Sequence, residues 1–167
     1  TYAFEGIINC TGATVAWLRD QLGLLENSEE SEQLASGLSD NDGVYLVPAF
    51  AGMGAPYWNE EARGVICGLT QHSTRAHFAR AALEAIAYQI RDVLDAMAQE
   101  SDAPVIELNA DGGGVRNAFL LQQIADIARV EVNASAVPEL SALGAAFLGM
   151  LGMGVHSSLA DLERLDL

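Results

Sequence analysis

Three consecutive glycines at positions 112–114 lie between an apolar run and a helical pattern, in the stretch LNADGGGVRNAF. The order strand, glycine-rich turn, helix points unpaired backbone N–H groups at an anion. Because glycine has no Cβ atom, a phosphate or a flat base can approach such a turn closely. The stretch therefore predicts a nucleotide site. A second interpretation stays open, in which the glycines only permit a tight turn and close packing of the helix.

Two further stretches place small residues in a helical pattern. In NCTGATVAW, Gly12 follows an expected strand and begins an expected helix, and SALGAAFLG over residues 141–149 gives another small-residue helix face. Several elements of this kind in one chain favour a shared cleft over unrelated turns. They shift the balance toward the nucleotide interpretation.

The charged residues exclude several other classes of function. The chain has 23 acidic residues against 8 lysines and arginines, a formal net charge of −15, which argues against nucleic acid or an anionic membrane surface as a partner. All eight of those basic residues are arginines, so a P-loop lysine and a Schiff-base lysine are both absent. Phosphate handling would have to come from backbone N–H groups, from Mg²⁺ or from residues outside this chain.

Other motifs fail on spacing. Residues 111–117 are not a dinucleotide fingerprint, because the last glycine of GxGxxG would fall at Asn117. His72, His77 and His156 lack the separation that a metal site on a helix needs. GxSxG and HExxH are absent, so the sequence indicates neither a hydrolase site nor a set of metal ligands.

The elements that would position these residues alternate between strand and helix signals, which argues for an α/β fold with a mixed sheet and packed helices. Residues 26–43 are expected to be a solvated loop with one short helix. The expected strands cover residues 2–9, 43–50, 64–69, 105–110 and 130–132, and the expected helices cover residues 13–24, 74–100, 117–128 and 141–155.

Two of the expected helices carry most of the apolar residues. The apolar run over 142–155 is too short to span a bilayer and is expected to be a buried helix. The helix over 74–100 has one apolar stripe at intervals of three and four residues, made of Leu83, Ile86, Ile90, Val93 and Met97.

Length and cysteine usage set the broad class. At 167 residues the chain is long enough for one domain, which would bury roughly 70% of the surface that the unfolded chain exposes. Cys10 and Cys67 have no partner spacing and are expected to be buried, reduced thiols, which suits a cytoplasmic protein. Because residue 1 is not Met and a strand is already under way at residue 2, we expect the chain to be part of a larger protein.

One long motif resembles a known family. The run GVICGLTQHSTRAHFARAALE, residues 64–84, resembles the C-terminal signature of the FGGY family of carbohydrate kinases. GAPYW at 54–58 is most similar to the branch of that family that acts on glycerol, and DGGGVRNAFLLQQIAD and SALGAAFLG are similar to its later nucleotide-domain motifs. The matching signature positions are Gly64, Ile66, Gly68, Leu69, His77, Phe78, Ala81, Ala82, Leu83 and Glu84.

The resemblance implies a fold, an activity and a division of labour. The fold would be that of an actin/hexokinase-like (ribonuclease H-like) kinase whose two domains close over Mg²⁺-ATP and a polyol. Residues 1–167 would be the C-terminal, nucleotide-binding domain, and the reaction would transfer the γ-phosphoryl group of ATP to a hydroxyl of glycerol, giving glycerol 3-phosphate. The catalytic base and the polyol-binding residues would precede Thr1, so no catalytic residue and no metal ligand is assigned within this chain. A homo-oligomer is compatible with this assignment.

Five residues are carried over as nucleotide-binding: Gly12, Ala16, Gly112, Gly113 and Asn117. Gly12 and Ala16 match positions beside the nucleotide on the first helix, and Gly113 and Asn117 match the pair that flanks it at the glycine-rich turn. Ala16 replaces a polar residue found in some members of the family, which removes any side-chain hydrogen bond there. Ala118 likewise replaces a second Asn, and neither change affects the backbone role of the glycines.

Alternatives from other classes stay open at this level. Within the kinases, the substrate could be another polyol or a ketose such as xylulose. Outside them, the chain could be a non-catalytic, actin-like nucleotide sensor, or an interaction domain whose glycines serve only packing.

Overall fold

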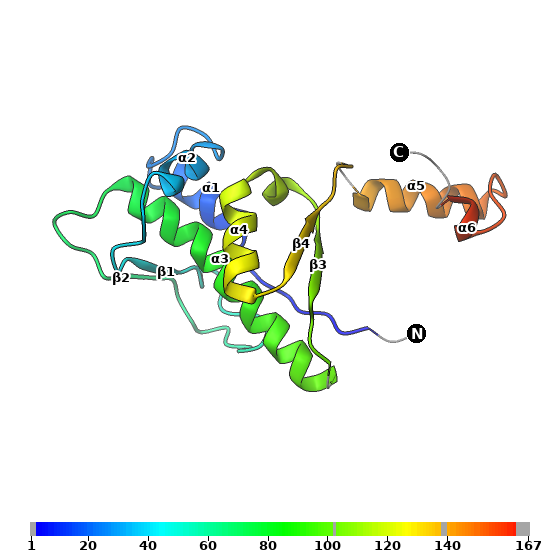
Figure 1. The fold of residues 1–167 in the computed structure, drawn as a ribbon, viewed down its shortest axis with the longest axis horizontal. Helices are drawn as coiled ribbons and strands as arrows, with labels where there is room; N and C mark the ends of the chain where they lie inside the picture. Colours follow the sequence, from blue (N-terminus) through cyan, green and yellow to red (C-terminus); the bar gives the residue numbers. More distant parts are fainter. Residues whose placement is uncertain (1–2, 102, 138–139, 163–167) are drawn as a thin grey trace.

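The computed structural model describes residues 3–101, 103–137 and 140–162 (Figure 1). Its helices are α1 (Gly12–Asp20), α2 (Glu30–Ser36), α3 (Arg75–Ser101), α4 (Ala118–Ala128), α5 (Leu140–Gly152) and α6 (Leu159–Leu162), with a 3-10 turn η1 (Gly113–Arg116). Its strands are β1 (Tyr45–Val47), β2 (Val65–Cys67), β3 (Glu107–Ala110) and β4 (Glu131–Ala134).

Helix α3, 27 residues long, is the element around which the others pack. It contacts α1, α2, α4 and β1. From the expected apolar stripe, Leu83, Ile86 and Val93 are buried, while Ile90 and Met97 are partly buried. A run of buried alanines, including Ala79 and Ala82, gives this helix a narrow profile, so that neighbouring helices can approach its backbone closely. Every residue of α3 over 81–87 is buried, so the core surrounds this part of the helix.

The strands form two separate two-stranded sheets. Strands β1 and β2 are antiparallel, with Val47 opposite Val65, and β3 and β4 are parallel, with Leu108 opposite Val132. The parallel pair needs a crossover, which η1 and α4 supply between β3 and β4. This strand–turn–helix–strand unit is the one that the sequence predicted around the three glycines.

The expected strand over residues 2–9 was wrong for its described part, because residues 3–9 form no strand; residue 2 lies outside the described residues. The segment instead lies against α3 as irregular chain. A Cβ atom on Gly6 would clash with Val93 Cγ1 of α3, and the Ile7 carbonyl accepts a backbone hydrogen bond of 3.0 Å from Ala55 N–H. A strand needs a hydrogen-bonding partner along its length, and alternating hydrophobicity does not supply one.

The expected burial of the last long helix was also wrong. Helix α5 contains no buried residue, and Figure 1 shows it extending away from the α3 side of the molecule. The Leu148 side chain is 66% exposed. An apolar composition indicates that a helix favours a packing partner, but it does not determine whether this chain contains one.

Burial differs between the two cysteines. Cys10 is buried, as expected, whereas Cys67 is exposed at the end of β2, and both are free thiols. Cys67 is exposed because its strand belongs to a two-stranded sheet, in which alternate residues face solvent. Among the described residues, no helix is both long enough and apolar enough to cross a membrane.

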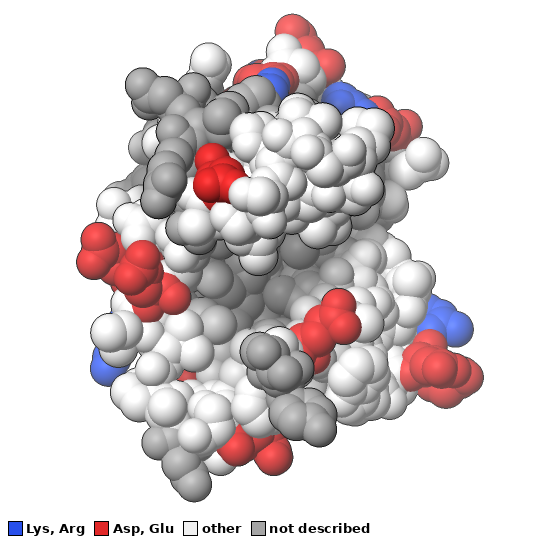
Figure 2. Space-filling model, turned by 90° about the vertical axis from the view of Figure 1, so that its right-hand side faces the viewer, with Lys and Arg blue, Asp and Glu red and all other residues white. Residues whose placement is uncertain are grey.

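Figure 2 shows the face that carries α5, where acidic side chains outnumber basic ones. This distribution agrees with the net charge of −15 for the whole chain.

Candidate functional site

A cavity of about 610 Å³ opens between the start of α1, the helix α2 and the turn from β3 through η1 to α4. Its volume lies within the roughly 300–1,000 Å³ that is typical of small-molecule sites. The lining residues come from five helices or turns and one strand, and α3 provides the floor with Ile86 and Ile90. The cavity is therefore bounded by segments from the N-terminal, central and C-terminal parts of the sequence.

Three of the five predicted nucleotide-binding residues meet at this cavity: Gly12, Gly113 and Asn117. The other two do not line it. Ala16 is partly buried on the next turn of α1, and Gly112 is exposed at the start of η1. The small-residue face over 141–149 lies on α5, which contributes no residue to the cavity, so the expected shared cleft joins two of the three small-residue stretches.

The glycines at the cavity have open space before them. A Cβ atom built on Gly12 or Gly113 would meet no heavy atom within 4 Å. Close packing against neighbouring protein atoms therefore does not explain the absence of a side chain at either position. Gly112 is different, because its φ of +84° lies in the left-handed region that favours glycine. The structure thus separates a glycine that shapes the turn from two that leave bare backbone facing a cavity.

Asn117 caps helix α4. Its Oδ1 accepts a hydrogen bond of 2.8 Å from the backbone N–H of Leu120, while its Nδ2 donates to Ser31 Oγ at 3.3 Å. An asparagine at this position satisfies one of the unpaired N–H groups of the first turn. Asn117 therefore fixes the start of α4 and joins it to α2 at the same time.

A second contact closes α2 against α4. The Glu32 carboxylate accepts a hydrogen bond of 3.2 Å from the backbone N–H of Ala118. With Leu120 paired to Asn117, two backbone N–H groups at the start of α4 already have partners within the chain. The sequence pattern suggested that these N–H groups point at an anion, but in the structure they do not, because they are already hydrogen-bonded within the chain. The part of the turn that faces the cavity is instead the bare backbone of η1.

The sequence predicted one short helix within residues 26–43, and α2 confirms it, but the place of this helix at the cavity was not predicted. The stretch was expected to be solvated, yet Ser28, Glu29, Ser31 and Glu32 line the cavity, and Ser31 is only 1% exposed. A local signal existed, because Asn27 Oδ1 accepts the backbone N–H of Glu30 at 2.9 Å, an asparagine three residues ahead of a helical segment. The acidic composition did not indicate that Ser31 and Ala35 of this helix are buried.

The cavity combines an apolar wall with a charged rim. Leu108, Leu120 and Ile124 contribute apolar surface, which suits a flat aromatic base. The charged lining residues are Glu29, Glu32, Asp111 and Arg116. Within the part of the chain that the structure describes, no cluster of three or more His, Cys, Asp or Glu side chains could hold a metal ion.

Comparisons with known proteins identify the fold and the family. Over residues 1–153 the chain matches the model of the FGGY family of carbohydrate kinases, C-terminal domain. It is 54% identical to a glycerol kinase of Shewanella sediminis and 53% identical to one of Shewanella woodyi, in each case over 163 residues, which are 98% of this chain and 33% of the relative.

Solved structures agree. A Plasmodium falciparum glycerol kinase with ADP superposes with a TM-score of 0.81 at 32% identity, covering 96% of this chain and 32% of that one. A gluconate kinase from Lactobacillus acidophilus gives a TM-score of 0.76 at 26% identity, covering 95% of this chain and 32% of the other. The fold is therefore the actin/hexokinase-like ATPase fold that the sequence predicted. The chain belongs to the FGGY family of carbohydrate kinases, and it spans about a third of the length of the curated relatives that it matches.

Proposed function

We propose that residues 1–167 are the nucleotide-binding, C-terminal domain of a kinase that transfers the γ-phosphoryl group of ATP to a hydroxyl of glycerol, giving glycerol 3-phosphate. The observation that carries the proposal is the cavity at which Gly12 and Gly113 present bare backbone to open space. Identity of 54% to a glycerol kinase over 98% of the chain supports glycerol as the acceptor.

The nucleotide is proposed to lie with its base against the apolar wall. Leu120 and Ile124 of α4 offer surface for one side of a flat ring, and the backbone at Gly113 lets the ring or the ribose approach without a Cβ in the way. Ala16 and Gly112, which do not line the cavity in this structure, remain predictions from the family resemblance. The ADP of the Plasmodium falciparum structure belongs to a protein of the same fold.

The chain contains no lysine, so the phosphates of the nucleotide would have to be bound by other groups. Phosphoryl transfer demands positioning and charge stabilisation more than covalent chemistry. We propose that Mg²⁺ accompanies the nucleotide and offsets the charge of its phosphates. Such an ion keeps several water ligands, which one or two carboxylates can orient, and Asp111 at the cavity is the residue proposed for this role. Arg116, also at the cavity, is the cation proposed to face the phosphates.

The catalytic base and the polyol-binding side chains are proposed to belong to the two thirds of the relatives' length that this chain does not span. The proposed partner is thus a small polyol, with no nucleic acid and no membrane, given a net charge of −15. A cytoplasmic location is proposed with it, because Cys10 and Cys67 are free thiols.

The test is ADP release by the full-length protein from Mg²⁺-ATP, with and without glycerol. Glycerol-dependent release is the expected result. Release that depends on a pentulose or a hexonate, and not on glycerol, would keep the kinase and replace the acceptor. ATP binding without any acceptor-dependent release would favour the nucleotide-sensor alternative. No ATP binding by the full-length protein would refute the proposal and leave the interaction-domain alternative.

A further inference from the structure

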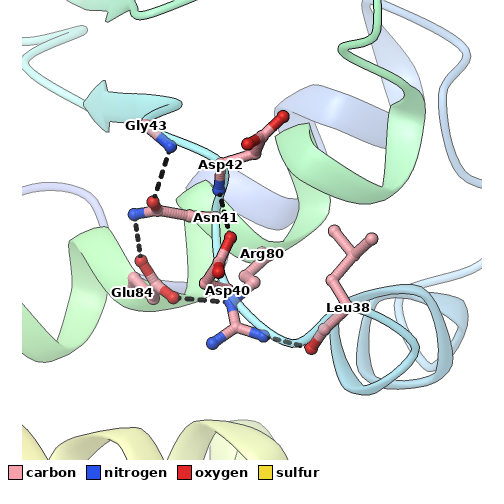
Figure 3. Close-up of polar contacts among 7 residues, drawn as sticks. All are labelled: Leu38, Asp40, Asn41, Asp42, Gly43, Arg80 and Glu84. Atoms are coloured by element: carbon pink, nitrogen blue, oxygen red, sulfur yellow. Dashed lines mark hydrogen bonds and ion pairs between the residues drawn. The ribbon is translucent and has the colours of Figure 1, made fainter.

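Two charged residues of α3, Arg80 and the signature residue Glu84, lie outside the cavity and are almost fully buried. Arg80 and Glu84 stand one turn apart on α3, with side chains that are 11% and 7% exposed, and Arg80 Nε lies 2.7 Å from Glu84 Oε1 (Figure 3). A buried charge is costly unless it is paired and hydrogen-bonded. Neither residue lines the cavity proposed to bind the nucleotide, so the burial of this charged pair needs another explanation.

The Glu84 carboxylate is satisfied at both oxygens. While Oε1 pairs with Arg80, Oε2 accepts a hydrogen bond of 2.8 Å from Asn41 Nδ2. Asn41 in turn accepts the backbone N–H of Gly43 at 3.0 Å, at the entry to β1 (Figure 3). Glu84 thereby holds the Arg80 guanidinium in one orientation and fixes the segment that follows α2.

The remaining contacts of Arg80 reach two of the helices that bound the cavity, α2 and α4. Its Nη1 donates to the backbone carbonyl of Leu38, two residues beyond the end of α2. Its Cζ lies 5.3 Å from the centre of the Phe119 ring, in the first turn of α4, within the range of a cation–π contact. One side chain therefore binds α2 at its C-terminal end and α4 at its N-terminal end.

The spacing between these two helices is what the cavity depends on. At the rim, Asn117 Nδ2 donates to Ser31 Oγ at 3.3 Å, and Ala118 N–H donates to Glu32 at 3.2 Å. Both contacts join α2 to the start of α4. Of the four residues that make them, all except Ala118 line the cavity. Movement of α2 relative to α4 would change the shape of the cavity without altering any residue that lines it.

We infer that Arg80, oriented by Glu84, is a positioning residue for nucleotide binding, which sets the distance between α2 and the first turn of α4. The inference rests on the proposed function for its effect on ATP, but its structural part is independent of it. A lysine could pair with Glu84 or with the Leu38 carbonyl, yet its single ammonium cannot reproduce the planar, fixed fork that serves both and stacks on Phe119.

The chain offers a matched control on the same helix. Arg91 pairs with Asp95 at 2.6 Å, also one turn apart, and donates to the backbone carbonyls of Ile127 and Ala128 at 3.1 and 3.3 Å. These carbonyls belong to the opposite, C-terminal end of α4, and none of these four residues lines the cavity. Arg80 and Arg91 thus each pair with an acidic residue one turn on and donate to backbone carbonyls, but Arg80 contacts the N-terminal end of α4 through Phe119, and Arg91 contacts the C-terminal end through two carbonyls.

The experiment compares Arg80→Met, Arg80→Lys and Arg91→Met in the full-length protein. For Arg80→Met the expected result is a KM for ATP raised about tenfold with a KM for glycerol changed less than about twofold, since remote misplacement of a binding group acts on the ligand it positions. Arg80→Lys should restore part of the affinity. Arg91→Met should lower the melting temperature and leave the KM for ATP within about twofold of the wild type.

Hydrogen exchange gives a readout that needs no activity. In Arg80→Met, the backbone amides of residues 28–38 and 117–121 should exchange faster than in the wild type. In Arg91→Met, faster exchange is expected instead for the amides of residues 125–130. If wild-type protein neither binds nor turns over ATP, the proposed function fails, and this exchange pattern still decides whether Arg80 positions α2. Unchanged exchange over 28–38, or an equal rise in both KM values, would overturn the inference. Should Arg80→Met not fold, Glu84→Gln provides the milder test, with an expected rise of about threefold in the KM for ATP.

Discussion

Replacing Gly113 is the most direct way to test whether bare backbone at the cavity serves a nucleotide. Gly113 does not adopt the positive φ angle that favours glycine, and a Cβ atom there would meet no protein atom within 4 Å. Neither Gly113→Ala nor Gly113→Val should therefore strain the folded chain. A glycine replaced at a compatible position often stabilises a protein, by about 0.4–1 kcal/mol for alanine, because the unfolded chain loses freedom.

The cost should appear only when the nucleotide binds. Valine adds a Cβ and two methyl groups to space that the ligand is proposed to occupy, and forcing extra carbon atoms into a packed contact costs about 1–3 kcal/mol. That corresponds to a dissociation constant for ATP raised by roughly 5- to 150-fold. Alanine adds one carbon and should lie at the lower end of this range.

The assay is calorimetric titration of Mg²⁺-ATP into the full-length protein, with a thermal melt of each variant alone. Gly37→Ala is the matched control, because a Cβ on Gly37 meets only ordinary contacts at 3.5 Å and the residue does not line the cavity. It should leave ATP affinity unchanged. Unchanged ATP affinity in Gly113→Val would remove Gly113 from the site, and a large fall in its melting temperature would show that the space is needed by the protein itself.

Three further results are expected. The isolated chain should show no glycerol-dependent ADP production, because the catalytic base is proposed to lie outside it; turnover by the purified chain would contradict this division. In this chain Leu83→Ala should lower the free energy of unfolding by about 2–5 kcal/mol, because the Leu83 side chain is only 1% exposed. Leu148→Ala on α5 should change the free energy of unfolding by less than about 0.5 kcal/mol, because Leu148 is 66% exposed. Equal effects of the two substitutions in chemical denaturation would mean that α5 is packed. The Tyr57 hydroxyl donates a hydrogen bond to Asp92 at 2.8 Å, and this bond, then desolvation, raises the pKa of Tyr57 above its ordinary value of 10.0. Folding thus favours the protonated phenol, so the contribution of this hydrogen bond to stability is complete below about pH 10 and is lost as the pH rises through the folded-state pKa. Tyr57→Phe should lower the free energy of unfolding by less than about 1 kcal/mol at pH 7 and should make its fall at alkaline pH less steep. An unchanged fall at alkaline pH would exclude the hydrogen bond.

The interaction-domain alternative is weakened by a feature that only coordinates could provide. A glycine needed for packing against a helix would have neighbours with which a Cβ would clash, as Gly6 has in Val93 of α3. Gly12 and Gly113 have none. The distinction between a glycine that faces protein and one that faces open space is invisible in the sequence, because both are simply glycine.

Local features were determined by the sequence. Periodicity predicted a helix over 74–100, which is α3 (Arg75–Ser101) in the structure. The strand predicted over 105–110 is β3 (Glu107–Ala110), and the helix predicted over 117–128 is α4 (Ala118–Ala128), while the 3-10 form of the turn between them was not predicted. These elements depend on contacts between residues a few positions apart, which is the range that periodicity and capping signals report. The lack of lysine and the family signature likewise needed no coordinates.

Tertiary structure decided everything that depends on a distant partner. Residues 3–9 alternate like a strand but pair with none, and the apolar helix α5 has no buried residue. The short helix expected in a solvated acidic stretch is instead a wall of the cavity, because Ser31 and Glu32 of α2 contact the start of α4 from 86 residues away. Glu84 was visible in the sequence as a signature position, and only the fold showed that the Arg80 guanidinium beside it contacts both the segment after α2 and the first turn of α4. Sequence patterns state that a residue favours a partner, and the three-dimensional packing determines which partner it has.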